Sequence, residues 1–191
     1  MDIGAFRRRL KPERRLDRLR VRPDDQLAGA GTVSAVARLL TDTTVYIHEW
    51  NGRLPDGAAA LIDGALRFHS SLCVSEIALG LDNYHPGSAD YEAAWAHYST
   101  VFRGIPRGRL LTADPDTMAQ AGIVTGILAR TQNYAKPQRT ALLNDAAIYL
   151  TAAKYGVPVL TENKADFNLI QQVVGVGSFI HYAALPRRTL G

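Results

Sequence analysis

Four acidic residues lie within apolar stretches of the sequence or shortly after them. They are Asp42, Glu76, Asp145 and Asp166. A carboxylate in apolar surroundings needs a partner, because its desolvation alone costs several kcal/mol. Lys164 is the only basic residue within three positions of any of the four, so the neighbouring sequence does not supply those partners. We therefore expect the four carboxylates to share a cation.

A hard divalent cation fits this set of side chains. Mg²⁺ prefers carboxylate and water oxygens and takes few protein ligands. The five histidines show no metal-ligand spacing and Cys73 is the only cysteine, which argues against zinc. Carboxylate-held metal suits phosphoryl chemistry, because it lowers the pKa of bound water and stabilises the leaving oxygen.

Each acid alone also has an ordinary structural explanation. Asp42 follows an apolar strand and could cap the next helix, and Asp166 could cap the turn after Asn163. Glu76 could lie on a solvated helix face. Asp145 is harder to explain in this way, because apolar residues precede and follow it.

The elements that must position these acids alternate between strands and helices. Apolar runs predict strands at 39–43, 108–112, 157–161 and 177–181. Helical periodicity and capping residues predict helices at 44–50, 57–69, 74–81, 89–102, 114–131 and 138–155. This order predicts an α/β/α sandwich, a parallel sheet flanked by helices on both faces. In such folds, polar groups at the carboxyl ends of strands face one crevice.

The excess positive charge is confined to the N-terminal segment. Residues 1–38 carry ten Lys or Arg and five Asp or Glu, a net charge of +5, whereas the remaining 153 residues carry a net charge of −1. We predict a basic N-terminal extension over 1–38, with helices starting near Pro12 and capped by Thr32, and a second domain over 39–185. The extension could bind RNA or a protein partner through its arginines, or it could be a solvated tail.

The composition predicts a cytoplasmic protein. One cysteine excludes an internal disulfide framework and fits a reducing compartment. The longest apolar runs, at 121–129 and 173–180, are too short to span a bilayer, so we expect no membrane association.

Four sequence blocks resemble the conserved blocks of PIN-domain proteins. The first is Leu39-Leu40-Thr41-Asp42-Thr43-Thr44-Val45-Tyr46-Ile47 and the second is Ser70-Ser71-Leu72-Cys73-Val74-Ser75-Glu76-Ile77. The third is Asn144-Asp145-Ala146-Ala147-Ile148 with Thr151-Ala152-Ala153, and the fourth is Val159-Leu160-Thr161-Glu162-Asn163-Lys164-Ala165-Asp166-Phe167. The third and fourth blocks together are the most specific. The similarity covers about residues 39–182, and residues 1–38 lie outside it.

The resemblance implies a PIN-like fold and an Mg²⁺- or Mn²⁺-dependent endoribonuclease, most similar to the toxins of VapBC toxin–antitoxin pairs. In that family pattern Asp42, Glu76, Asp145 and Asp166 bind metal directly or through water. Thr43 and Asn163 would not bind the metal themselves but would orient these ligands. It also implies an RNA substrate, a cognate antitoxin and a homodimer.

The sequence departs from the family pattern at Thr44, where an asparagine is usual. The second block can also be aligned five residues later, which would place Leu81 at the acidic position. The register with Glu76 is preferred because it retains an acid.

Other functions remain as alternatives. The protein could instead be a non-catalytic RNA-binding or assembly module with a PIN-like fold. A flap-type DNA nuclease is disfavoured by the absence of a long helical arch, and a receiver domain by the absence of paired early acids. No glycine-rich phosphate loop follows a strand, so an NTPase is not indicated.

Overall fold

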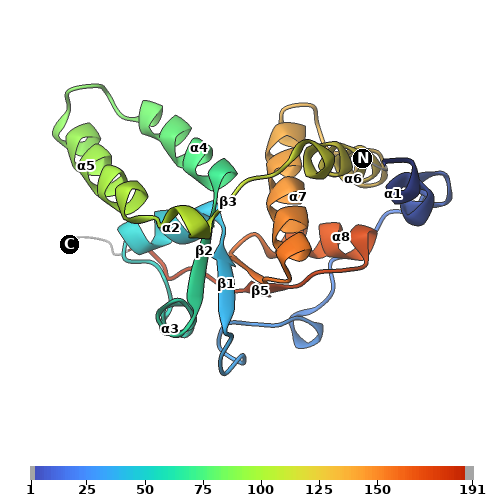
Figure 1. Ribbon diagram of the computed structural model, residues 1–191, viewed down its shortest axis with the longest axis horizontal. Coiled ribbons are helices and arrows are strands. Elements are labelled where there is room, and N and C mark those ends of the chain that lie inside the picture. Colours follow the sequence, from blue (N-terminus) through green and yellow to red (C-terminus); the bar gives the residue numbers. More distant parts are fainter. Residues whose placement is uncertain (1–2, 188–191) are drawn as a thin grey trace.

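A computed structural model describes residues 3–187 of the chain (Figure 1). Its centre is a five-stranded sheet with the order β3-β2-β1-β4-β5, in which every pair of neighbours is parallel. The strands are β1 (Arg38–Thr41), β2 (Leu66–Ser70), β3 (Leu110–Leu111), β4 (Val159–Thr161) and β5 (Phe179–His181). The predicted parallel α/β sheet is confirmed.

The helices follow the strands in the alternation that parallel pairing requires. They are α1 (Ile3–Leu10), α2 (Thr43–Trp50), α3 (Asp56–Gly64), α4 (Ser71–Gly80), α5 (Ala89–Gly104), α6 (Pro115–Gln132), α7 (Gln138–Tyr155) and α8 (Lys164–Val174). Short 3₁₀ turns occur at Pro12–Arg14, Asp24–Gln26, Leu81–Asn83 and Arg107–Arg109.

Both faces of the sheet are covered, because consecutive strand residues point to opposite sides. On one face Leu40, Val159 and Phe179 pack in a cluster that includes residues of α4, α6, α7 and α8. On the other face Leu39, Leu160 and Ile180 pack against residues of α2 and α3. Both halves of the predicted sandwich are therefore present.

Two groups of helices project from the sheet on either side of β1 (Figure 1). Helices α4 and α5 project on one side, and α6 and α7 project on the other. The strand β1 lies between the two groups. This arrangement positions the candidate site.

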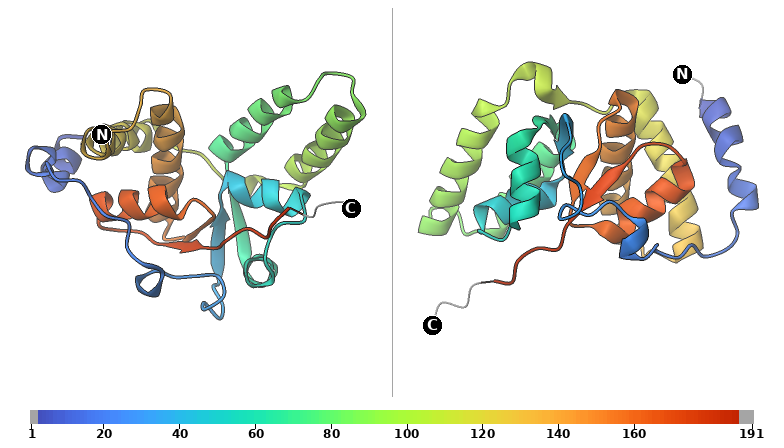
Figure 2. Two further views of the ribbon diagram at one scale, coloured as in Figure 1. Left: turned by 180° about the vertical axis from the view of Figure 1, so that it is seen from behind. Right: turned by 90° about the horizontal axis from the view of Figure 1, so that it is seen from below.

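The N-terminal segment 3–37 lies along the body of the protein. Phe6 and Leu10 of α1 are buried in the same apolar cluster as Leu40. The chain then passes α8 and reaches the outer edge of β5 (Figure 2), where Gly29 forms a parallel bridge with His181.

Some elements differ from the sequence predictions. The predicted helix 57–69 ends at Gly64, and residues 66–70 form β2, a strand hydrogen-bonded to β1 and β3. The apolar residues at 65, 66 and 68 suit either period, so the pairing partners decide the conformation. In the N-terminal segment, the helix expected near Pro12 is a single 3₁₀ turn and no helix follows Thr32, whereas α1 was not predicted.

No helix within residues 3–187 is long and apolar enough to cross a membrane.

Candidate active site

Asp42 occupies the turn between β1 and α2, where the residue is 2% exposed. Its Oδ2 atom accepts hydrogen bonds from the hydroxyls of Thr44 (3.0 Å) and Thr161 (2.8 Å). Thr161 ends β4, which pairs directly with β1, so the sheet itself brings the two residues together. Thr44 thus supplies a donor to Asp42 at the position where the family pattern has asparagine.

Glu76 lies on α4, in the helix that follows β2. Ser70 caps the start of this helix by accepting from the Leu72 amide at 3.2 Å. The Glu76 carboxylate accepts a hydrogen bond from the Thr43 hydroxyl and another from Asn144 Nδ2 at 2.7 Å. Glu76 therefore connects α2, α4 and α7 across the space between the two helix groups.

Leu81, the alternative to Glu76 in the shifted register, is a buried core residue in the 3₁₀ turn after α4. Its side chain packs among apolar neighbours and offers no ligand atom. The arrangement therefore favours Glu76 as the acidic residue of the second block.

Asp145 and Asp166 are joined by one asparagine. Asn163 Nδ2 lies 3.0 Å from Asp145 Oδ2 and 3.0 Å from Asp166 Oδ2. Asn163 also caps α8, because its Oδ1 accepts from the Asp166 amide at 3.3 Å. The other Asp166 oxygen accepts a hydrogen bond from the Tyr134 hydroxyl.

Neighbouring carboxylates raise the pKa values of the two buried acids, Asp42 and Asp145. The pKa of Asp42 is raised, first by burial and also by repulsion from Glu76, against hydrogen bonds that lower it. The pKa of Asp145 is raised well above its usual range by burial and then by repulsion from Asp42, Asp166 and Glu76. Four acids from different elements therefore form one electrostatically coupled site.

No cationic side chain within residues 3–187 hydrogen-bonds to any of the four carboxylates. Lys164, the nearest in sequence, pairs instead with Asp24. The oxygen-only donor set and its uncompensated charge fit a hard divalent cation. In the part of the chain that the structure describes, however, no three Asp, Glu, His or Cys side chains converge into a ready-made metal site. The carboxylates point to Thr and Asn donors, so ligation would need side-chain rotation or intervening water.

Sequence reasoning did not assign roles to Asn144, Thr161 and Tyr134. Asn144 and Thr161 lie within the third and fourth blocks, where their proximity to an acid was a usable signal. Tyr134 lies in the loop between α6 and α7, 32 residues from Asp166, and no local pattern links the two.

Comparison with solved structures places this arrangement in a known fold. FitAcB from Neisseria gonorrhoeae has a TM-score of 0.55 and 18% identity over 75% of this chain and 96% of that chain. VapBC2 from Rickettsia felis, bound to a DNA fragment from its promoter, has a TM-score of 0.53 and 14% identity over 76% and 98%. A FitAB structure with an IR36 DNA fragment has a TM-score of 0.54 and 18% identity over 75% and 94%.

The chain has a PIN-like fold. No protein-family model and no curated protein matches it. At these identities the likeness concerns the fold alone.

Proposed function

We propose that the protein is a divalent-metal-dependent endoribonuclease and the toxin of a VapBC-type toxin–antitoxin pair. The observation that carries this proposal is the coupling of four carboxylates, from the β1–α2 turn, α4, α7 and α8, at a site without a cationic side chain in the described chain. The similarity to VapBC and FitAB structures supports the same conclusion.

In this proposal Asp42, Glu76, Asp145 and Asp166 hold Mg²⁺ or Mn²⁺ directly or through water. The bound metal lowers the pKa of water and stabilises charge at the leaving oxygen of the phosphodiester. Thr43 fixes the orientation of Glu76, and Asn163 holds Asp145 and Asp166 in one relative position. No protein nucleophile is required.

The proposed partners are an RNA substrate, a cognate antitoxin and a second copy of the chain in a cytoplasmic homodimer. The antitoxin is supported by the fold neighbours, which are named as VapBC and FitAB assemblies. The homodimer rests on the family resemblance. Sedimentation of the purified protein, with and without the product of an adjacent gene, tests both partners.

The deciding experiment is cleavage of total cellular RNA by the purified protein, free of antitoxin. We expect cleavage with Mg²⁺ or Mn²⁺ and none with EDTA. The matched variant is Asp145→Asn, which keeps the size and hydrogen-bonding capacity of the side chain but removes a charge. We expect it to lose more than the 10–100-fold typical of residues that only orient a ligand.

A different result would favour the second candidate, a non-catalytic RNA-binding or assembly module. In that case the wild-type protein would not cut RNA with any divalent cation, and Asp145→Asn would bind RNA as well as the wild type. The raised pKa of Asp145 would then affect the stability of the fold and play no part in catalysis.

A further inference from the structure

A second feature borders the four-carboxylate site on the side of α8. It is a pocket of about 860 Å³ between the N-terminal segment and the α6–α7 loop. We call it the arm pocket. It is lined by Arg18, Leu19, Arg20, Val21, Gln132, Asn133, Tyr134, Gln138 and Leu169. Residues 18–21 lie outside the part of the sequence that resembles PIN-domain proteins.

Tyr134 connects the arm pocket to the candidate active site. It lines the pocket, and its hydroxyl donates a hydrogen bond to Asp166. A chain-like ligand with its reacting bond near Asp166 would therefore enter the arm pocket on passing Tyr134.

The segment that carries the two pocket arginines is fixed by its backbone. In the amide orientation that satisfies both groups, Gln132 donates to the Leu19 carbonyl (3.2 Å) and accepts from the Leu19 amide (2.7 Å). Gln172 Nε2 donates to the Arg20 carbonyl at 2.9 Å. Leu19 packs partly buried against the core, while Arg18 and Arg20 on either side of it are exposed.

Arg18 and Arg20 differ from the neighbouring arginines in their side-chain contacts. Arg15 and Arg22 donate to groups on α8. Within residues 3–187, the guanidinium groups of Arg18 and Arg20 have no carboxylate partner, and the pocket lining contains no acid. Their backbone is anchored, and their exposed charges are not neutralised by a carboxylate.

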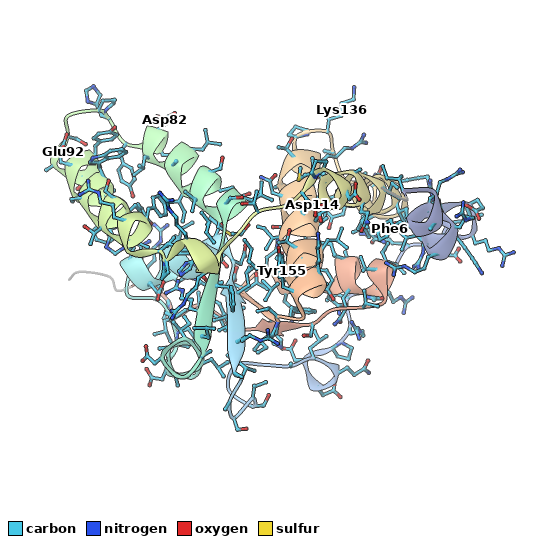
Figure 3. All side chains as sticks on the ribbon, viewed as in Figure 1. Phe6, Asp82, Glu92, Asp114, Lys136 and Tyr155 are labelled. Atoms are coloured by element: carbon cyan, nitrogen blue, oxygen red, sulfur yellow. The ribbon has the colours of Figure 1, made fainter. Side chains whose placement is uncertain are left out.

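Two further basic residues lie close in sequence to the lining residues Tyr134 and Gln138. Lys136 lies at the outer end of the α6–α7 loop (Figure 3), and Arg139 begins the next helical turn, where its Nε donates to the Tyr134 carbonyl at 3.3 Å. Gln138 and Asn133 add amide groups to the lining. Guanidinium and amide groups beside the partly buried ring of Tyr134 suit phosphate oxygens and an unpaired base.

We propose that the arm pocket binds the phosphate backbone of the single-stranded RNA next to the bond that is cut, with Arg18 and Arg20 as the phosphate contacts. This inference rests on the proposed nuclease function and assigns a substrate-binding role to the N-terminal segment. A charged contact on phosphate releases counterions, so each arginine contributes to the salt dependence of binding.

The test compares two double variants in an Asp145→Asn background, which prevents cleavage. Arg18→Gln/Arg20→Gln removes the pocket charges. Arg7→Gln/Arg14→Gln removes the same charge from exposed positions of the same segment outside the pocket lining. Binding of a fluorescein-labelled, mixed-sequence 20-nucleotide RNA is measured by anisotropy at several salt concentrations.

We expect the pocket variant to bind on the order of tenfold more weakly at 0.1 M salt. The slope of log affinity against log salt should fall by about 1.4, since each phosphate contact to a single strand contributes roughly 0.7. In the control variant, the affinity and the salt slope should both change much less than in the pocket variant. Thermal unfolding checks that both variants fold as the parent does.

Equal losses in the two variants would overturn the assignment, because they would reflect the net charge of the segment. Unchanged RNA binding together with a weaker antitoxin complex would also overturn it, in favour of a protein partner for these arginines.

The wild-type protein provides a separate check of the proposed function. If it neither cuts total RNA nor binds the labelled RNA, the proposed function fails; if it does both and the pocket variant matches it, only the arm pocket assignment fails.

Discussion

Burial, followed by repulsion from neighbouring carboxylates, raises the pKa of Asp145 when no cation is bound. The folded-state pKa of Asp145 lies above its ordinary value of 3.8, because of burial and three neighbouring acids. The fold therefore favours the protonated form of Asp145 more than the unfolded chain does. The resulting stabilisation is complete below the ordinary pKa and is lost as the pH rises through the raised value.

Asp145→Asn should accordingly stabilise the metal-free protein. In EDTA at pH 8 we expect its Tm to exceed that of the wild type by about 2–4 °C, or ~1 kcal/mol for a chain of this size. At pH 5 the difference should be smaller. Added Mg²⁺ or Mn²⁺ should raise the Tm of the wild type more than that of the variant. Scanning calorimetry at both pH values measures this, and a variant less stable than the wild type at pH 8 in EDTA would contradict it.

Asn163 combines two roles that a substitution can separate. Its Oδ1 caps α8, whereas its Nδ2 holds Asp145 and Asp166 together. Serine is a good helix cap but lacks the amide donor. We expect Asn163→Ser to retain the stability of the wild type within about 0.3 kcal/mol, because serine and asparagine cap about equally well, and to lose 10–100-fold in RNA cleavage.

Asn163→Ala provides the control, because it removes both the cap and the donor. It should lose stability as well as activity, by about 1 kcal/mol for the cap. If Asn163→Ser cleaves RNA at the wild-type rate, the bridge between the two aspartates does not orient them for catalysis.

The residues that were predictable from the sequence are those whose signal is local. Asp42 and Asp145 stand among apolar neighbours, and burial raises the pKa of both. Thr43 hydrogen-bonds to Glu76, and Asn163 hydrogen-bonds to both Asp145 and Asp166. The family pattern names both residues, but of these contacts only the one between Asn163 and Asp166 lies within a single sequence block. Tyr134 and Asn144 contact acids supplied by other elements, and such contacts follow only from the packing of α7 against α4 and α8. The metal itself stays a prediction, since the side chains are not preassembled around one point.

At the scale of elements, Arg15 fastens the N-terminal segment to the end of α8. Its guanidinium donates to the carbonyls of Val173 (3.0 Å) and Gln172 (3.4 Å) in the last helical turn, and to Leu10 (2.8 Å) at the end of α1. These carbonyls have no partner within their own helices at such positions, so a side-chain donor stabilises both ends.

Arg15→Ala should therefore lower the free energy of unfolding by about 1–3 kcal/mol, given hydrogen bonds from a charged donor to partly buried carbonyls. The matched control is Arg18→Ala, which removes an exposed arginine with no hydrogen bond among the described residues and should stay within about 0.5 kcal/mol. Urea denaturation compares the two variants. Equal effects would mean that the contacts of Arg15 add nothing to the stability.

Elements whose conformation depends on distant partners were the hardest to predict. The strand β2 reads as a continuation of α3, because Ala65, Leu66 and Phe68 satisfy a helical spacing as well as an alternating one. Pairing with β1 and β3 decides in favour of the strand. Helices with clear caps were predicted correctly, such as α5 after Ser88 and α7 before Gly156. The path of the N-terminal segment depends on tertiary contacts and could not be read from its sequence.

At the scale of the whole molecule, the N-terminal segment and the body share one apolar core. Phe6 and Leu10 are 6% and 2% exposed and belong to the cluster that contains Phe167 of α8 and Leu128 of α6. Figure 3 shows Phe6 on α1 beside the α6–α8 side of the protein. Near the other end of the segment, Gly57 of α3 lies against residue Ala30, where an added Cβ would come within 2.9 Å of the Ala30 carbonyl oxygen. The segment is thus in contact with both faces of the sheet.

Unfolding of the segment and of the body should therefore be a single cooperative event. Leu10→Ala leaves a cavity in the shared core, and we expect it to lower the free energy of unfolding by ~2–5 kcal/mol. Tryptophan fluorescence reports this change from a distance, because the two tryptophans, Trp50 and Trp95, lie on α2 and α5. If the core is shared, the urea midpoint seen by fluorescence shifts with the midpoint seen by circular dichroism. If the fluorescence midpoint stays fixed while circular dichroism shows early loss of helix, α1 folds separately and the segment is only an attachment to the body.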